Sequence, residues 1–164
     1  MRSVQLRMTV TGRGATEVYD ILTDFSRYPE FSSAVQSVTV TKVDDTVSRS
    51  EWEVAFRNGI LKWIEEDTFD RAALRIDFRQ IEGDIALFNG SWTCSETKNG
   101  ASIKFVAQLD MGIPTLADAL EPIAVRAVVD NTMAIVSGLF GSAVHVNKTQ
   151  LESPPAQAPA QPTA

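Results

Sequence analysis

Apolar and polar residues alternate from Ser3 to Thr11, and a period of two predicts a strand with one buried face. The apolar positions change to helical spacing over residues 16–25, so we expect a short helix there. Pro29 restricts the residue before it, and residues 26–31 are therefore predicted as a turn or a second short helix.

Six further alternating segments follow, which predict strands over residues 35–43, 47–56, 60–69, 74–82, 85–94 and 101–111. The pairs Asn58-Gly59 and Asn99-Gly100 are strong signals for tight hairpin turns. Seven strands joined mostly by tight turns predict an antiparallel sheet.

The last third of the chain returns to helical spacing. Its apolar stripe predicts a long helix from about Glu121 to about Val144, roughly 35 Å at 1.5 Å per residue. Pro122 is expected to prevent an unbroken helix from Thr115, where a capping-box pattern predicts a separate helical turn. Residues 149–164 are rich in Pro and Ala and are predicted to be a disordered tail, which leaves one domain over residues 1–148.

This order of elements predicts an α+β fold, and it resembles the helix-grip fold of the START and Bet v 1 (SRPBCC) superfamily. The segment Tyr28-Pro29-Glu30-Phe31 is similar to the Tyr/Trp-Pro-x-Phe/Leu segment that follows the first helix in many members. The resemblance implies a curved seven-stranded antiparallel sheet wrapped around the long C-terminal helix, two short helices after the first strand, and a cavity between sheet and helix.

Two motifs narrow the resemblance. Arg79-Gln80-Ile81-Glu82, followed by Trp92, looks like a segment of bacterial polyketide aromatases and cyclases. Leu87-Phe88-Asn89-Gly90 is similar to the coenzyme Q chaperones of the same superfamily. The first resemblance implies a cofactor-free polyketide cyclase or dehydratase of antibiotic biosynthesis, and the second a lipid or quinone carrier without catalysis. A toxin-like or ribosome-associated member that acts through its surface is a third class.

Composition and charge exclude other classes. The 164 residues carry a net charge of −6, which argues against nucleic acid as a partner and makes the surface-acting class the least favoured. Cys94 and His145 are the only residues of their kinds, so we expect no internal disulfide, no zinc site and no metal. The sequence contains no phosphate-binding loop or dinucleotide fingerprint, and we expect no cofactor.

Location and partners are predicted in the same way. No uninterrupted apolar run approaches the ~18 residues of a membrane span, and the N-terminus has no apolar secretory core, so we expect a cytoplasmic protein that is not integral to a membrane. The expected partner is a hydrophobic small molecule, with presentation by an acyl carrier protein as one option. The protein is expected to be a monomer or a homodimer.

Two acids on the strand over 60–69 are candidates for catalysis. Trp63, Glu65 and Asp67 share one face, and Trp63 matches a cavity-lining Trp of the cyclases, so this face is expected to point inward. Burial there raises the pKa of a carboxyl toward the range useful for acid and base catalysis. The alternative is a reversed or bulged register, with Glu65-Glu66-Asp67 a solvated charge run. The cyclases have Arg where this chain has Asp67, and a carboxylate cannot stabilise an oxyanion as Arg does, although it can abstract a proton or protonate a leaving hydroxyl.

Asn131 is the third catalytic candidate, because it interrupts the apolar stripe of the long helix and a buried amide needs hydrogen-bond partners. A ligand can supply them, and so can the sheet or bound water. The candidates for substrate binding are the large rings, the Gln of the cyclase-like motif, and a glycine that leaves room beside the sheet: Tyr28, Phe31, Trp63, Phe88, Trp92, Phe105, Gln80 and Gly90. For each single ring, the alternative is ordinary core packing.

Overall fold

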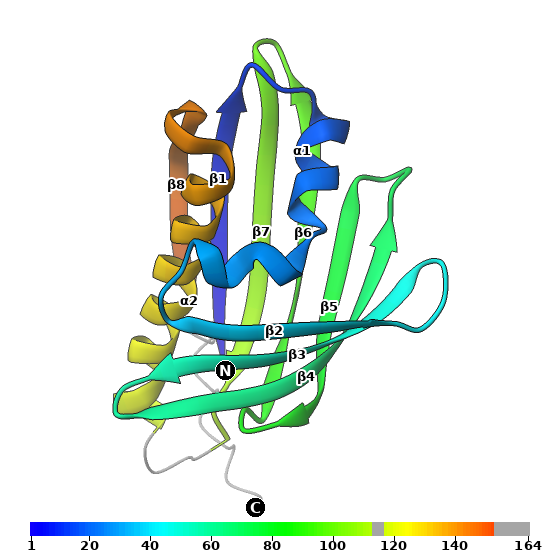
Figure 1. The fold of residues 1–164 in the computed structure, drawn as a ribbon. Coiled ribbons are helices and arrows are strands. Elements are labelled where there is room, and N and C mark those ends of the chain that lie inside the picture. Colours follow the sequence, from blue (N-terminus) through cyan, green and yellow to red (C-terminus); the bar gives the residue numbers. More distant parts are fainter. Residues whose placement is uncertain (113–116, 153–164) are drawn as a thin grey trace, which may run out of the picture.

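The computed structural model describes residues 1–112 and 117–152. The elements are, in chain order, β1 (Arg2–Thr11), α1 (Ala15–Leu22), η1 (Phe25–Glu30), β2 (Val35–Lys42), β3 (Val47–Phe56), β4 (Gly59–Asp70), β5 (Arg75–Gly83), β6 (Leu87–Thr97), β7 (Gly100–Asp110), α2 (Ala117–Phe140), η2 (Gly141–Ala143) and β8 (Val144–Glu152). The strands form one sheet in the order β2-β3-β4-β5-β6-β7-β1-β8, and every neighbouring pair is antiparallel (Figure 1).

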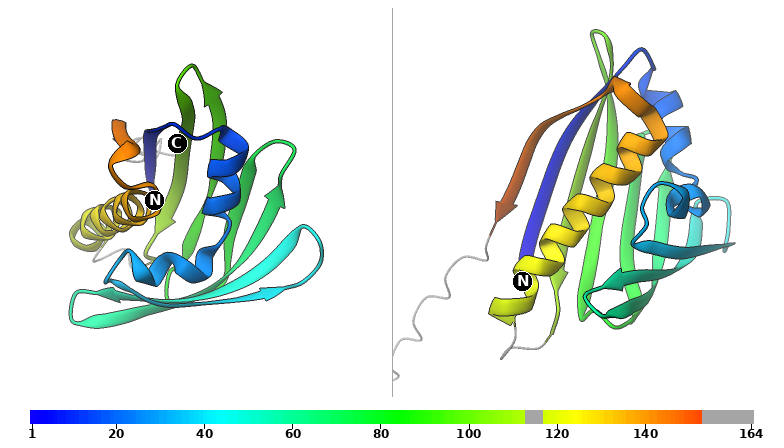
Figure 2. Two further views of the ribbon diagram at one scale, coloured as in Figure 1. Left: turned by 45° about the horizontal axis from the view of Figure 1, so that its top comes forward. Right: turned by 60° about the vertical axis from the view of Figure 1, so that its left-hand side comes forward.

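The sheet curves strongly, and α1, η1 and α2 all lie on its concave side (Figure 2). α2 packs against β1, β7 and β8 at one end of the sheet. β2 and β3 curl over from the other end, with η1 packed on β2. The inward residues of β1, Leu6 and Met8 among them, are completely buried in the core. This arrangement confirms the predicted α+β helix-grip fold with a long C-terminal helix.

Both predicted hairpins form, but each turn lies one residue earlier than the Asn-Gly pair. Phe56 pairs with Gly59, so the turn consists of Arg57 and Asn58. Arg57 adopts φ +56°, a conformation that is favoured in tight two-residue turns. Thr97 pairs with Gly100 in the same way. The resulting register places Trp52 directly opposite Trp63.

The predicted number of strands was one too low, and the predicted end of the long helix was too late. α2 ends at Phe140, and Gly141 turns the chain with φ +64° into η2. β8 then pairs antiparallel with β1 at the sheet edge, and it includes residues 149–152, which the sequence analysis assigned to the tail. The remainder of that predicted tail, residues 153–164, lies outside the described residues.

The predicted break at Pro122 is also wrong, because α2 begins at Ala117 and runs through this proline. Pro122 lies in the second turn, where its missing N–H removes one intrahelical hydrogen bond close to the end of the helix. The predicted capping box begins at Thr115, outside the described residues.

By length and composition, the segment Ala119–Ala143 passes the test for a membrane span, with a mean hydropathy of 1.5. The core helix of a soluble protein passes the same test. Here the helix packs inside the curved sheet, and 39% of the tested window is buried. The segment is therefore weak evidence for a membrane span.

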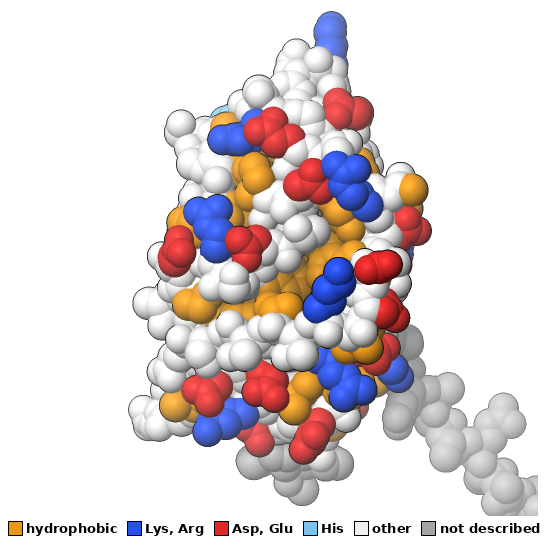
Figure 3. All heavy atoms as spheres, turned by 45° about the vertical axis from the view of Figure 1, so that its right-hand side comes forward, with side chains coloured by type: hydrophobic (Ala, Val, Ile, Leu, Met, Phe, Trp, Pro, Cys, Tyr) orange, Lys and Arg blue, Asp and Glu red, His pale blue; other side chains and the backbone are white. Residues whose placement is uncertain are grey.

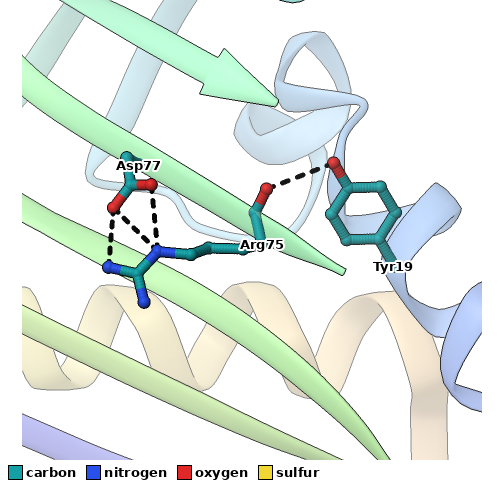
Figure 4. A network of polar contacts seen from close by, with 3 residues as sticks. All are labelled: Tyr19, Arg75 and Asp77. Carbon is teal, nitrogen blue, oxygen red and sulfur yellow. Dashed lines mark hydrogen bonds and ion pairs between the residues drawn. The ribbon is translucent and has the colours of Figure 1, made fainter. Parts of the chain in front are cut away.

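Charged side chains of both signs are interspersed over the face shown in Figure 3, with hydrophobic side chains exposed between them. Polar contacts also attach α1 to the sheet. Glu96 of β6 accepts a hydrogen bond from the Ala15 backbone N–H at the start of α1 (2.5 Å). Tyr19 donates its hydroxyl to the Arg75 carbonyl of β5 (3.3 Å), and the Arg75 guanidinium binds Asp77 on the same strand (Figure 4).

Candidate functional site

An apolar cavity of about 110 Å³ lies between the concave face of the sheet and α2, with lining residues from η1, from β2 to β7 and from α2. The lining residues that remain half-buried, including Phe56, Leu61, Phe88 and Val128, come from the β3–β4 hairpin, the start of β6 and the middle of α2. The cavity therefore opens between these elements. Its volume is below the ~300–1,000 Å³ of common ligand pockets, so it suits a small molecule or one end of a larger one.

Aromatic rings form a continuous series of contacts along the cavity wall. Trp52 and Trp63 stack in parallel, with ring centroids 5.7 Å apart and planes 3° apart. Trp63 meets Phe88 edge to face, Phe78 contacts both Phe88 and Phe105, and Phe105 contacts Trp92 at 4.7 Å. All three tryptophans of the chain line the cavity, so their fluorescence reports on its contents.

Glu65 and Asp67 both lie on the inner face of β4, as the alternation predicted, and the solvated alternative is wrong. Their side chains are 3% and 0% exposed. Glu65 lines the cavity, whereas Asp67 lies behind it and is not part of the lining. Of the two acids, only Glu65 can therefore contact a ligand in the cavity.

Three side chains, Trp63, Ser50 and Trp52, hold the two carboxyl groups in place. The Trp63 indole N–H donates to Glu65 Oε1 (2.9 Å), and Glu65 is hydrogen-bonded to Asp67. On β3, the Ser50 hydroxyl donates to Asp67 Oδ2 (2.5 Å) and accepts a hydrogen bond from the Trp52 indole N–H (2.8 Å). The Trp63 indole thus binds Glu65 directly, and the Trp52 indole binds the Ser50 hydroxyl that donates to Asp67.

The pKa of each carboxyl group in the pair is raised. Burial raises the pKa of Glu65 well above its usual value, and the hydrogen bond and charge of Asp67 raise it further. Burial also raises the pKa of Asp67, although its hydrogen bonds with Glu65 and Ser50 oppose that effect. Asp67 Oδ1 is buried without an N–H or hydroxyl donor among the described residues, and a proton on Glu65 supplies one. Of the two carboxyl groups, Glu65 therefore has the stronger tendency to hold a proton.

Asn131 lines the cavity from α2, and a hydrogen bond from another side chain of the same chain orients its amide. The Ser32 hydroxyl, between η1 and β2, donates to Asn131 Oδ1 (2.9 Å). This bond directs the amide at the cavity and ties α2 to the opposite wall. Both of the interpretations left open for this residue are compatible with that position.

Five of the eight predicted substrate-binding residues line the cavity: Tyr28, Trp63, Phe88, Trp92 and Phe105. Tyr28 offers its ring only, because its hydroxyl donates to the Leu22 carbonyl (2.5 Å). Burial, followed by the charges of Glu65 and Asp67, raises the pKa of Tyr28 well above its usual value, so it stays neutral. The binding roles of all five remain predictions.

The other three residues are not part of the cavity lining. Phe31 packs over Gly138 of α2, where an added Cβ would clash with the ring. Gln80 uses its side-chain amide to bind the Ile85 carbonyl of the β5–β6 connection. Gly90 leaves room for the Phe78 ring and for the β7 backbone, not for a substrate. In each case a neighbouring element fills the space that the sequence analysis assigned to a ligand.

The sequence analysis missed Ser50, Trp52 and Thr132. Trp52 and Thr132 line the cavity, and Ser50 is completely buried beneath it. Alternation along β3 places Ser50 and Trp52 on one face. A turn at Asn58-Gly59 would have set Trp52 opposite Glu65, and only the observed turn at Arg57-Asn58 sets it opposite Trp63. Thr132 follows Asn131 and carried no separate signal.

No group of three or more His, Cys, Asp or Glu side chains in residues 1–112 and 117–152 could hold a metal ion. Cys94 is buried, and burial raises the pKa of its thiol to about 12, so it behaves as a small apolar side chain. The chemistry available at the cavity is therefore that of a neutral carboxylic acid, an amide and a hydroxyl beside aromatic rings.

Comparisons with solved structures show the same fold in several proteins. TTHA0849 from Thermus thermophilus is 21% identical, with a TM-score of 0.73 over 82% of this chain and 93% of that chain. The Zhui aromatase/cyclase from a Streptomyces species is 15% identical, with a TM-score of 0.72 over 86% and 93%. A START superfamily protein from Mycobacterium smegmatis is 11% identical, with a TM-score of 0.71 over 85% and 97%.

No curated protein matched the sequence. Residues 12–136 match the family described as polyketide cyclase / dehydrase and lipid transport, which confirms the resemblance to the START and Bet v 1-like superfamily. The match includes η1, β2 to β7 and most of α2, which together form the cavity and the carboxyl pair. The chain belongs to the polyketide cyclase / dehydrase and lipid transport family.

Proposed function

We propose that this protein binds a hydrophobic, oxygenated polyketide-like intermediate in its cavity and assists cyclisation or dehydration of that intermediate. The observation that carries the proposal is the buried Glu65 at the wall of an apolar, ring-lined cavity, where burial raises its pKa. Family membership supports binding of a hydrophobic small molecule. Burial of a carboxyl group lowers the stability of a protein whose cavity only has to hold an apolar ligand. The presence of Glu65 in the lining therefore favours a role in chemistry.

In a dehydration, Glu65 donates its proton to the leaving hydroxyl as the C–O bond breaks, and the oxygen departs as water. The resulting carboxylate accepts the proton from the carbon next to the substrate carbonyl as the double bond forms. Glu65 thus returns to its protonated state without a cofactor. Asp67 acts as a positioning residue through its hydrogen bond to Glu65, and Asn131 orients the substrate oxygen.

Binding is tested by titrating neutral aromatic ketones and quinones while following tryptophan fluorescence. Because all three tryptophans line the cavity, we expect quenching that saturates. Catalysis is tested with a phenyl β-hydroxy ketone, whose dehydration product is a conjugated enone with strong ultraviolet absorbance. The absence of quenching by every ligand would overturn the binding proposal.

The variant Glu65→Gln keeps the shape of the side chain but cannot transfer a proton, so we expect a loss of turnover of about 100-fold or more with binding retained. Glu66→Gln is the matched control, because Glu66 lies next in sequence on the outer face and should retain full turnover. For Asp67→Asn we expect reduced turnover and a shifted pH profile. Full turnover in Glu65→Gln would exclude Glu65 as the acid.

The second candidate function is that of a non-catalytic lipid or quinone carrier, favoured by the almost wholly apolar lining. In that case ligands bind equally well to the native protein and to Glu65→Gln, and neither converts the hydroxy ketone. We also propose a cytoplasmic location, action as a monomer or homodimer, and substrate delivery in free form or on an acyl carrier protein. Size-exclusion chromatography of this protein mixed with an acyl carrier protein tests the mode of delivery, because coelution of the two proteins would support delivery on the carrier.

A further inference from the structure

The charges around the cavity limit the kind of ligand it can hold, and this inference rests on the proposed function. Glu65 reaches the lining, and Asp67 lies directly behind it. The described lining residues include no Lys, Arg or His. Among these residues, the carboxyl pair therefore has no cationic partner.

The basic side chains of the adjoining strand β5 are paired elsewhere. Arg79 lies 3.6 Å from Glu66, and Arg75 lies 2.8 Å from Asp77. Arg79 and Arg75 are 68% and 48% exposed, so both guanidinium groups are in contact with solvent. Neither of them can neutralise a negative group inside the cavity.

We propose that the cavity accepts ligands that are uncharged at the end that reaches Glu65, and that it rejects carboxylates. A carboxylate entering this space would lose its hydration, meet no cation among the described lining residues and face two carboxyl groups. A ketone, ester, thioester or alcohol oxygen is instead able to bind the Glu65 carboxyl, the Asn131 amide or the Thr132 hydroxyl. The ligand class is thus a masked acid or a ketone rather than a free acid.

The test uses three ligands with the same ring system: methyl naphthoate, naphthoate and naphthylmethylammonium. Binding is measured by calorimetry at neutral pH with the full-length protein. We expect the ester to bind at least tenfold more tightly than the carboxylate. The ester should also bind more tightly than the ammonium, because the proton on Glu65 leaves the wall less attractive to a cation than an ionised pair would be.

Two variants locate the origin of the difference. The double variant Glu65→Gln with Asp67→Asn removes the charge of the pair and keeps its shape, so the ester-to-carboxylate ratio should fall at least threefold. Glu66→Gln removes a negative charge from the same strand on the outer face, and the ratio should stay unchanged. If the double variant does not fold, the single variant Glu65→Gln and the three-ligand series on the native protein still decide the question.

Equal binding of ester and carboxylate would overturn the inference while leaving the proposed function intact. Tighter binding of the ammonium would also overturn the inference, because it would show that the wall acts as an anionic site, and it would contradict Glu65 as the proton donor while leaving ligand binding itself intact. An unchanged ratio in the double variant would also contradict the role of the carboxyl pair. If none of the three ligands binds, the proposed function itself fails.

Discussion

Three consecutive acids on β4 lie in two different environments. Glu65 and Asp67 face the concave interior and have carboxyl, hydroxyl and indole partners. Glu66, between them, faces outward, is 33% exposed and lies 3.6 Å from the Arg79 guanidinium. The same local sequence thus places acids both in an apolar interior and at the solvent boundary, because successive side chains of a strand point to opposite faces.

Several acids at the surface of the molecule are paired with cations. Arg75 binds Asp77 on β5 (Figure 4), and Arg71 holds Asp20 through two hydrogen bonds of 3.0 and 2.9 Å. The hydrogen bonds from Arg71 lower the pKa of Asp20. The mixture of acidic and basic side chains over the face in Figure 3 has the same character. Inside, the described cavity lining contains no cation and the pKa of each carboxyl group is raised, and this difference leads to four predictions.

The largest expected difference is in stability. Asp67→Ala leaves the Ser50 hydroxyl and the Glu65 carboxyl as buried donors without an acceptor, and we expect a loss of about 2–4 kcal/mol in the free energy of unfolding. Glu66→Ala, on the outer face, should change stability by less than about 0.5 kcal/mol. Urea unfolding followed by circular dichroism measures both. Similar losses in the two variants would remove the distinction between the faces.

The two faces should also respond to pH with opposite signs. Because the folded pKa of Glu65 is raised, the native state keeps a proton that the unfolded state releases, so stability falls as pH rises above the ordinary Glu value. As pH rises above about 4, Glu65→Gln should therefore gain stability relative to the native protein, by up to about 1.4 kcal/mol per pH unit, until the folded pKa of Glu65 is reached.

For Asp20 the sign is reversed, because its folded pKa is lowered. Its contribution is present above the unfolded pKa and is lost as pH falls through the folded pKa. Asp20→Asn should therefore lose stability relative to the native protein as pH rises toward about 4, and above that pH the difference should stay constant. Urea unfolding of the Asp20 variant below about pH 4 and of the Glu65 variant above it gives the two slopes, and slopes of the same sign would contradict the directions of the two pKa shifts.

Removal of Ser50 tests the hydrogen bonds that support the carboxyl pair from β3. Ser50→Ala leaves the Trp52 indole N–H without its acceptor and removes the donor to Asp67, and we expect a loss of about 1–3 kcal/mol. The pKa of Asp67 should also rise, because that donor lowers it. Ser95→Ala, at an exposed position of β6, is the control and should be nearly neutral. A neutral result for Ser50→Ala would mean that water replaces its hydroxyl at no cost.

The smallest effect is expected for the ion pair on the outer face. Arg79→Gln and Glu66→Gln should each cost only about 0–1 kcal/mol, because both side chains reach water and salt screens their attraction. A double-mutant cycle at low and high salt measures this coupling. A coupling as large as that between Glu65 and Asp67 would mean that the outer face is less hydrated than its exposure indicates.

Much of the site was predictable from periodicity alone. The alternation around Trp63 predicted that Glu65 and Asp67 face inward, and the helical stripe predicted that Asn131 faces the cavity. Five of the predicted binding residues line the cavity for the same reason. The side on which a residue lies is a local property of the backbone, so the sequence contains it.

The depth at which a side chain lies depends on what packs above it. Nothing around Asp67 in the sequence indicates that Glu65 separates it from the cavity, or that Ser50 binds it from 17 positions away. The sequence pattern predicted that the Phe31 ring contacts a ligand and that Gly90 leaves open space. In the structure, α2 lies against Phe31 and the Phe78 ring lies against Gly90.

The sequence by itself determined the fold class, the inner and outer faces of each strand and the acid pair on β4, because these follow from periods of two and 3.6 residues along the backbone. Tertiary structure decided the pairing of β8 with β1, the stacking of Trp52 on Trp63 and the choice of Glu65 as the acid at the wall. These features depend on contacts between elements far apart in the chain. Burial then raises the pKa of both carboxyl groups beside a described cavity lining without a cation, and both features arise only when the sheet closes around α2.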